Sequence, residues 1–149
     1  MARMDRDNDV RRAAMNLLAR REHSRSELRT KLRRRGVDGD DIDPVLDGLD
    51  AEGLQSDARY AESLAHSHAR KGKGPLRIRA ELRQHGVDDA VIASALAALS
   101  STWVESAQAA RRKRFGEALP DSRAERARQA RFLEQRGFTA EHIRAALAR

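Results

Sequence analysis

The sequence predicts an all-α protein in which three tandem three-helix repeats form an elongated, curved array. A six-residue frame occurs three times, around Gly36, Gly86 and Gly137. It consists of Leu, two residues of any kind, Arg or His, Gly and an apolar residue, and it is followed each time by Ile and Leu. Its spacing of about 50 residues is typical of repeat architectures. Ala, Leu, Arg and Glu dominate, and only 3% of residues are aromatic, which favours helices over strands. Each frame indicates one helix that ends at the glycine and another that follows it.

The first repeat is expected to cover residues 9–54, after a disordered segment of residues 1–8. Its first helix is capped by aspartates near its start and ends at Glu22. The run Ser24-Arg25-Ser26-Glu27 has the form of a capping box, in which each end residue satisfies a free amide of the other. The second helix therefore begins there and ends at Gly36.

The third helix of this repeat is predicted to begin near Asp40 or Asp41. Asp38 is the natural cap, but a start at Asp38 would place Pro44 in the helix interior. Proline lacks an amide donor and clashes with the preceding turn at such a position. We expect the helix to end at Gly53.

The second repeat is expected to cover residues 55–100. Its first helix is predicted for residues 56–70 and is followed by the basic, glycine-rich turn Lys71-Gly72-Lys73-Gly74. Pro75 then takes the first position of the second helix, where its fixed φ is favourable. Gly86 ends that helix, and a third helix follows.

The third repeat is expected to cover residues 101–149. The runs Thr102-Trp103-Val104-Glu105 and Ser122-Arg123-Ala124-Glu125 predict capping boxes at the starts of its first two helices. A connector of residues 115–120 separates these helices, and Thr139 caps the last one. No repeat has enough apolar residues to be stable by itself, so we expect the three to stack.

The composition narrows the class and the location of the protein. A formal net charge of +7 and a pI near 10.8 indicate an acidic partner, with nucleic acid the first candidate. The chain has no cysteine, which excludes disulfides and thiolate chemistry. It also has no apolar run that is long enough to cross a membrane, and its N-terminus does not have the form of a secretion signal. We therefore expect a cytoplasmic protein that does not contact membranes.

The charges are segregated along the chain. Residues 38–57 contain eight acids and no Lys or Arg, whereas residues 20–35 contain eight basic residues and two acids. Solvated helix faces explain any single run of this kind. Together, the two runs predict a surface with a basic side and an acidic side, which can orient the protein on a partner.

Three motifs resemble those of the RecX family, and the resemblance covers nearly the whole chain. They are Ala19-Arg20-Arg21-Glu22-His23-Ser24-Arg25-Ser26-Glu27-Leu28, Asp57-Ala58-Arg59-Tyr60-Ala61-Glu62 and Gly74-Pro75-Leu76-Arg77-Ile78-Arg79-Ala80-Glu81-Leu82. The resemblance implies a regulator of the RecA recombinase in recombinational DNA repair and the SOS response. Such a regulator binds along the groove of the RecA nucleoprotein filament and suppresses ATP hydrolysis, strand exchange and coprotease activity. It is not an enzyme, and we expect a monomer without a cofactor.

The candidate partner-binding residues are cations that could meet the acidic groove of the RecA filament and the phosphates of its DNA. The cluster in the middle repeat carries most of the expectation. Whether single- or double-stranded DNA is contacted directly stays open, and the alternative function is a stand-alone nucleic-acid-binding protein that competes for DNA. The candidates are Arg25, Arg29, Arg33, Arg70, Lys71, Lys73, Arg77, Arg79, Arg83, Arg111, Arg112, Lys113 and Arg114.

Other kinds of site are less well supported by the sequence. The aromatic residues Tyr60, Trp103, Phe115, Phe132 and Phe138 stand at helical spacing among aliphatic residues, so we assign them to the core rather than to base stacking. The pair of histidines at positions 66 and 68 would point apart on a helix, which does not favour a metal site. The helix after the glycine turn is acidic in the first repeat and alanine-rich in the second, which disfavours a sequence-specific DNA reader.

Overall fold

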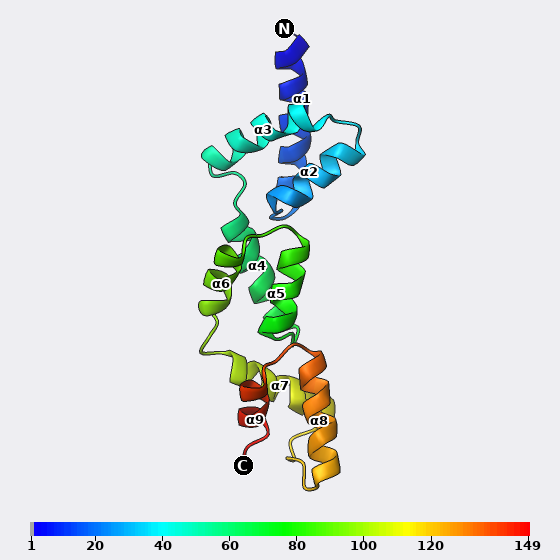
Figure 1. Cartoon of the computed structure of the whole chain (residues 1–149), viewed down its shortest axis with the longest axis vertical. Helices are drawn as coiled ribbons and strands as arrows, with labels where there is room; N and C mark the ends of the chain where they lie inside the picture. Colours follow the sequence, from blue (N-terminus) through cyan, green and yellow to red (C-terminus); the bar gives the residue numbers. More distant parts are fainter. Residues whose placement is uncertain (1) are drawn as a thin grey trace.

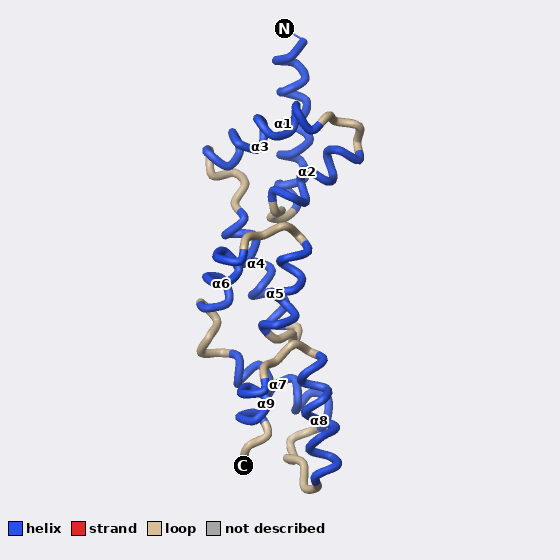
Figure 2. Tube along the Cα trace, in the orientation of Figure 1, coloured by secondary structure: helices blue, strands red, loops and turns tan. Residues whose placement is uncertain are grey.

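The computed structural model describes residues 2–149, and all regular structure in this range is helical. Nine helices in this range form three successive groups of three, which confirms the predicted fold class (Figure 1). Loops join consecutive helices (Figure 2). The helices are α1 (Ala2–Arg20), α2 (Arg25–Arg34), α3 (Gly39–Ala51), α4 (Asp57–Arg70), α5 (Pro75–Gln84), α6 (Asp89–Ala97), α7 (Trp103–Phe115), α8 (Arg123–Gln135) and α9 (Ala140–Ala146).

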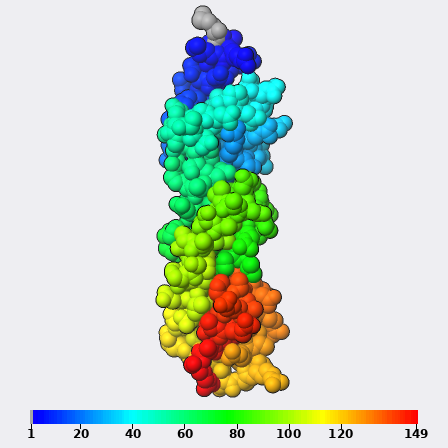
Figure 3. Space-filling model, turned by 60° about the vertical axis from the view of Figure 1, so that its left-hand side comes forward, coloured from blue at the N-terminus to red at the C-terminus, as the bar shows by residue number. Residues whose placement is uncertain are grey.

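The molecule is an elongated stack of three units. Unit 1 contains α1–α3, unit 2 contains α4–α6 and unit 3 contains α7–α9. They follow one another along the long axis in the order of the sequence, as the colours in the space-filling view show (Figure 3). The second helices of the units, α2, α5 and α8, lie along one side of the stack in Figure 1, and α3, α6 and α9 lie along the other.

Buried apolar side chains form two clusters. One cluster lies within unit 1 and includes Leu28, Leu32 and Leu46. The other runs through units 2 and 3 and includes the motif leucines Leu82 and Leu133, both without exposed surface. Units 2 and 3 therefore share one apolar core, whereas unit 1 has its own and meets unit 2 through polar contacts.

Two helices of unit 1 begin earlier than the sequence indicates. α1 begins at Ala2, although residues 1–8 were expected to be disordered; Met1 itself lies outside the described residues. Val10 is buried on this helix, and Arg11 forms an ion pair of 2.6 Å with Glu52 just after α3. These tertiary contacts hold the middle of α1 from Val10 onwards, and the mostly exposed residues before it continue the same helix back to Ala2.

α3 begins at Gly39, with Pro44 inside the helix. The side chain of Asp38 caps it by accepting a hydrogen bond from the amide of Asp40 at 3.3 Å. Pro44 removes one backbone hydrogen bond, but burial of Ile42 and Leu46 on the same helix offsets this loss. Our prediction of a later start was wrong because it gave the proline more weight than the core.

The capping boxes predicted from sequence have different outcomes. The amide of Glu27 donates to Ser24 Oγ and the amide of Ser24 donates to Glu27 Oε1, each at 3.1 Å, so the first box is complete. Thr102 does not cap α7; its hydroxyl donates instead to the carbonyl of Leu99 at 2.7 Å. The backbone of Thr102 is helical rather than extended, which turns its side chain away from the free amides.

The motif glycines also form the joints between units. A Cβ on Gly86, after α5, would lie 2.5 Å from the Cβ of Ser26 at the start of α2. A Cβ on Gly137, after α8, would lie 2.5 Å from the Cβ of Arg77 at the start of α5. Gly36 lies in the first of the three units, and a Cβ there would meet nothing within 4 Å. The same turn thus docks on the second helix of the preceding unit at both joints.

Hydrogen bonds repeat across the two joints at equivalent positions. Ser24 Oγ donates to the carbonyl of His85 at 2.8 Å in the first joint. The amide of Gly74 donates to the carbonyl of Arg136 at 2.7 Å in the second. In both cases the acceptor is the residue just before the motif glycine, and the donor is the cap residue of the preceding unit's second helix. Each unit is therefore set on its neighbour by the same geometry.

Candidate partner-binding surface

The arginines of α2 are balanced by the acidic helix α3 of the same unit. Arg25 Nη1 lies 2.8 Å from Asp47 Oδ1, and Arg29 Nε lies 3.1 Å from Asp43 Oδ1. Arg33 is exposed and has no ion pair among residues 2–149. The basic run and the acidic run of unit 1 thus neutralise each other in part, which reduces the free positive charge of this unit.

The corresponding helix of unit 2 has fewer such partners. Arg79 stands seven residues before Gly86, as Arg29 stands seven residues before Gly36, but Ala93 takes the place that Asp43 holds in unit 1. Arg79 is exposed and has no ion pair within the described part of the chain. α5 therefore presents a guanidinium that its own unit leaves available.

Other exposed residues of α5 surround Arg79. Leu76 is 47% exposed, which is unusual for a large apolar side chain in this protein. Arg77 is exposed, and Arg83 is exposed although its Nε lies 2.8 Å from Asp89 Oδ1. Both side chains of this pair are exposed to solvent, which screens their attraction, so the pair does not prevent Arg83 from meeting a partner. We call Leu76, Arg77, Arg79, Ala80 and Arg83 the α5 face.

The turn between α4 and α5 adds a partly screened cation. Lys73 Nζ lies 3.9 Å from Glu81 Oε2, and His68 Nδ1 lies 3.1 Å from the same oxygen. His68 Nδ1 is buried and its contact with Glu81 lacks hydrogen-bond geometry. Burial lowers the pKa of His68, so at neutral pH we treat its ring as uncharged. Lys73 therefore supplies the positive charge that faces Glu81.

A cleft of about 580 Å³ brings predicted cations of units 2 and 3 together. It lies between the end of α4, the turn after it, α7 and α8. Arg70 and Lys71 enter from unit 2, and Lys113 and Arg114 enter from unit 3. None of these four side chains has an ion pair among residues 2–149. The remaining lining residues are Ala69, Gly72, Thr102, Glu105, Ser106, Ala109, Ala110, Phe132 and Arg136.

Arg136 is a cleft residue that the sequence analysis missed. Its Nε donates to the carbonyl of Gly72 at 3.1 Å, and its Nη2 donates to the carbonyl of Lys71 at 2.5 Å. These bonds tie the end of α8 to the turn that carries the cations of unit 2. They join residues more than sixty positions apart, and no local sequence signal reports such a contact.

Arg111 does not belong to the partner-binding surface, contrary to our sequence-based prediction. The side chain is 3% exposed, and its guanidinium donates to the carbonyls of Ala118 at 3.0 Å and Glu117 at 3.1 Å. Arg111 follows Trp103 and Ala107 at intervals of four residues, which places all three on the buried face of α7. It anchors the connector between α7 and α8, while Arg112 stays exposed outside the cleft.

The aromatic residues are placed mainly as the sequence predicts. Tyr60, Trp103 and Phe138 are buried in the core of units 2 and 3. Phe115 and Phe132 are half-buried and pack edge to face with ring centroids 5.4 Å apart. The guanidinium of Arg114 lies 5.8 Å from the centroid of Phe132, which favours a cation–π contact at the cleft wall.

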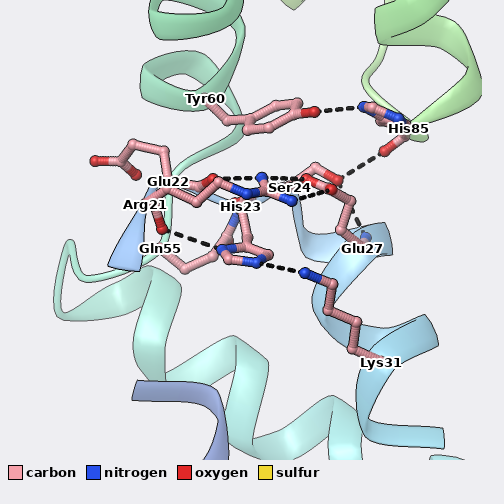
Figure 4. A network of polar contacts seen from close by, with 9 residues as sticks. All are labelled: Arg21, Glu22, His23, Ser24, Glu27, Lys31, Gln55, Tyr60 and His85. Carbon is pink, nitrogen blue, oxygen red and sulfur yellow. Dashed lines mark hydrogen bonds and ion pairs between the residues drawn. The ribbon is translucent and has the colours of Figure 1, made fainter. Parts of the chain in front are cut away.

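A polar network fixes unit 1 on unit 2 (Figure 4). Ser24 Oγ of unit 1 donates to the carbonyl of His85 in unit 2 at 2.8 Å. On the side of unit 1, Arg21 Nη2 donates to Glu27 Oε2 at 2.9 Å, and on the side of unit 2 the hydroxyl of Tyr60 is hydrogen-bonded to His85 Nδ1. Burial opposes ionisation of Glu27, but hydrogen bonds from Arg21 and Ser24 outweigh it and lower the pKa of Glu27 to about 2. Burial and the negative charge of Glu27 raise the pKa of Tyr60. The carboxylate is therefore ionised beside a neutral phenol at neutral pH.

His23 extends this network into unit 1. The ammonium of Lys31 can only donate, and it lies 3.0 Å from His23 Nε2, so this nitrogen accepts. Nδ1 then carries the proton and donates to the carbonyl of Arg21 at 3.0 Å. Burial lowers the pKa of His23, in agreement with a neutral ring. Gln55 Nε2 also lies 3.4 Å from the carbonyl of His23, which links the end of unit 1 to the same network.

The described residues, 2–149, show neither a membrane span nor a metal-binding cluster. No helix in this range combines the length and the apolar character that a membrane span requires. Within the same range, His, Asp and Glu side chains do not gather in groups of three or more that could hold a metal ion.

Comparisons with known proteins place the chain in a family. Models of the first, second and third three-helix domains of RecX match residues 11–49, 56–96 and 104–147. The regulatory protein RecX of Halorhodospira halophila is 50% identical over 139 residues, which cover 93% of this chain and 86% of that protein. That of Pseudomonas savastanoi pv. phaseolicola is 49% identical over 134 residues, covering 90% and 86%.

Solved structures agree with the sequence comparisons. The crystal structure of RecX from Lactobacillus salivarius superposes with a TM-score of 0.84 at 25% identity, over 96% of this chain and 95% of that one. A second crystal structure, of a regulatory protein RecX, has a TM-score of 0.80 at 22% identity, over 95% of this chain and 71% of that one, and supports the fold. The chain therefore belongs to the RecX family of regulatory proteins.

Proposed function

We propose that this protein binds the RecA nucleoprotein filament in the cytoplasm and inhibits its ATP hydrolysis, strand exchange and coprotease activity. Membership of the RecX family supports a regulatory role in DNA recombination and repair. The single observation that carries the contact is the set of unpaired cations on the α5 face and in the cleft, since both lie on one elongated stack. The protein itself has no catalytic part in this proposal.

The stack supports a mechanism based on selection of one filament state. Units 2 and 3 share a core, and unit 1 is joined to unit 2 by the hydrogen bond from Ser24 to His85 and by the ion pair between Glu22 and Arg59, so the cations keep fixed positions. A fixed array that lies in the groove of a filament binds best to one arrangement of subunits. Binding then disfavours the subunit motions of the ATPase cycle, because a ligand shifts an equilibrium by its difference in affinity for the two states.

Competition for DNA is the alternative mechanism, and the α5 face favours a protein contact over it. Leu76 is exposed between Lys73 and Arg79, and phosphates give an apolar side chain of this kind nothing to bind. Protein interfaces, in contrast, bury apolar residues beside arginine at their centres. The acids of α3 also reduce the free charge that a purely electrostatic DNA binder would use.

The ATPase activity of RecA at saturating DNA distinguishes the two mechanisms. Filament binding predicts inhibition that persists when more DNA is added, whereas competition predicts that added DNA relieves it. Arg79→Ala and Arg29→Ala form a matched pair, since each removes one guanidinium from an equivalent helix position. We expect Arg79→Ala to raise the half-inhibitory concentration about tenfold, because its charge is unpaired, and Arg29→Ala to change it little. Relief by added DNA, or equal effects of the two variants, would contradict the proposal.

A further inference from the structure

The cleft between α4, α7 and α8 combines a cationic rim with an apolar floor. Arg70, Lys71, Lys113 and Arg114 supply four positive charges around it. We propose that this cleft docks a short segment of a partner protein that carries an apolar side chain next to carboxylates. The inference rests on the proposed function, because it assigns the segment to the protein component of the filament and not to its DNA.

The floor of the cleft is the first argument for a protein segment. Ala69, Ala109, Ala110 and Phe132 line it, and the three alanines leave room that larger side chains would fill. Burying an apolar side chain there gains about 25 cal/mol for each Å² removed from water. A sugar-phosphate backbone has no comparable group to offer, whereas a Leu, Ile or Phe of a peptide does.

The rim is the second argument, and it defines the charge of the segment. The four cations have no acid of their own within residues 2–149, so a carboxylate that reaches them does not displace an internal ion pair. Arginine and carboxylate form strong, often bidentate hydrogen bonds. Lys113 and Arg114 lie on the side of unit 3, and Arg70 and Lys71 lie on the side of unit 2, so acids on both sides of an apolar residue find partners.

Glu105 is the third argument, because it selects against a continuous run of phosphates. It is the one acid among the described lining residues, and it is exposed. Every phosphate carries a negative charge, and a strand through the cleft would bring one near this carboxylate. A peptide offers backbone amides as donors to the same oxygen atoms. The cleft is therefore better matched to a polypeptide than to a nucleic acid.

The size and support of the cleft fit this use. A volume of about 580 Å³ lies within the range of roughly 300–1,000 Å³ of well-formed binding sites. The bonds of Arg136 to the carbonyls of Lys71 and Gly72 hold the two walls at a fixed separation. The site is thus formed before its ligand arrives, which reduces the entropy lost on binding.

A variant that fills the cleft tests the inference without altering its charge. Ala109 is exposed on α7, so Ala109→Phe places a ring in the hollow while the core stays intact. Ala124→Phe puts the same ring on an exposed site of α8 outside the cleft and away from the α5 face, and serves as the control. Fluorescence anisotropy of the labelled full chain then measures binding to RecA assembled with DNA, to RecA assembled without DNA, and to an oligothymidine alone.

We expect Ala109→Phe to weaken binding to both RecA assemblies at least about tenfold and to leave binding to the oligothymidine and the control variant unchanged. Wild-type affinity of Ala109→Phe for RecA would overturn the inference and leave the proposed function standing. An equal loss of oligothymidine binding would assign the cleft to nucleic acid. Failure of the wild-type protein to bind either RecA assembly would overturn the proposed function and this inference together.

A charge variant gives a second test, which does not depend on whether the fold accommodates the phenyl ring of Ala109→Phe. Lys113→Glu with Arg114→Glu reverses two rim charges, and Arg123→Glu with Arg131→Glu makes the same change on exposed positions of α8 outside the cleft. We expect only the first pair to abolish binding to RecA assembled without DNA. Equal effects of the two pairs would show that net charge, and not the cleft, governs the contact.

Discussion

Glu27 is the residue on which several contacts at the joint of units 1 and 2 converge. It completes the capping box of α2, pairs with Arg21 and lies near His85 and Tyr60. Its side chain is 14% exposed, yet the contacts with donors lower its pKa from 4.5 to about 2. A carboxyl whose pKa is lower in the folded state stabilises that state above its unfolded pKa.

The replacement Glu27→Gln should therefore lower stability in a pH-dependent way. Above about pH 4.5 the ionised carboxylate contributes fully, and we expect the variant to be less stable by about 1–2 kcal/mol after allowance for solvent screening. As the pH falls towards about 2, Glu27 takes up a proton and the difference from wild type should close. Urea unfolding followed by circular dichroism at neutral pH and near pH 2 measures this difference.

Glu62→Gln provides the control for this experiment. Glu62 is exposed on α4 and has no ion pair within residues 2–149, so its replacement should change stability little at either pH. A difference between wild type and Glu27→Gln that stays constant with pH would contradict the role assigned to the carboxylate.

At the residue scale, helical phase decides which cations of a basic run reach the surface. The run from Arg111 to Arg114 was predicted as one binding cluster, but Arg111 is buried and Lys113 and Arg114 line the cleft. The interval of four residues from Trp103 and Ala107 to Arg111 is visible in the sequence and would have separated it. Arg136 could not have been found this way, because its role depends on a turn of another unit.

At the element scale, the motif glycine has one task in unit 1 and two tasks in the other units. Gly36 and Gly86 both have positive φ, of 91° and 76°, which an L side chain adopts with strain. Of these two glycines, only Gly86 also lacks room for a Cβ, because Ser26 of the preceding unit lies against it. The glycines therefore occupy the same position in the repeated sequence but differ in whether they contact a preceding unit.

Alanine substitutions separate the two tasks. Gly36→Ala should cost about 1 kcal/mol of the free energy of unfolding, since only backbone strain is added. Gly86→Ala should cost this amount and about 1–3 kcal/mol more, because the methyl group forces unit 2 away from α2. Urea unfolding of both variants under one set of conditions gives the comparison. Equal losses would argue against direct docking of the glycine turn on the preceding unit.

The helices themselves could be predicted because their signals are local. The proline at the start of α5 and the capping box of Ser24 and Glu27 mark element starts correctly. The start of α3 could not be placed because tertiary burial outweighs the local signal there, whereas the first turns of α1 are mostly exposed and simply continue a helix whose buried face begins at Val10. Pro44 lies where α1 and α3 approach each other, beside Asp7 and Arg11, and no pattern within α3 alone indicates this contact.

At the scale of the whole molecule, the arrangement of units decides where positive charge is available. The sequence predicts a basic side and an acidic side, but in unit 1 the two meet at the α2–α3 contact and cancel in part. Unit 2 has fewer acids that would do the same, and the joint with unit 3 opens a cleft that four cations share. The cations of units 2 and 3 could be identified from the sequence. That they line one cleft could not be predicted, because this depends on how unit 3 packs on unit 2.

A reconstruction of this protein on an ATP-bound RecA filament tests the central claim most directly. We expect the stack to lie in the groove of the filament, with Arg79 of the α5 face and Lys113 of the cleft directed at RecA subunits. A reconstruction in which the protein covers bare DNA, or in which both residues face solvent, would contradict the account.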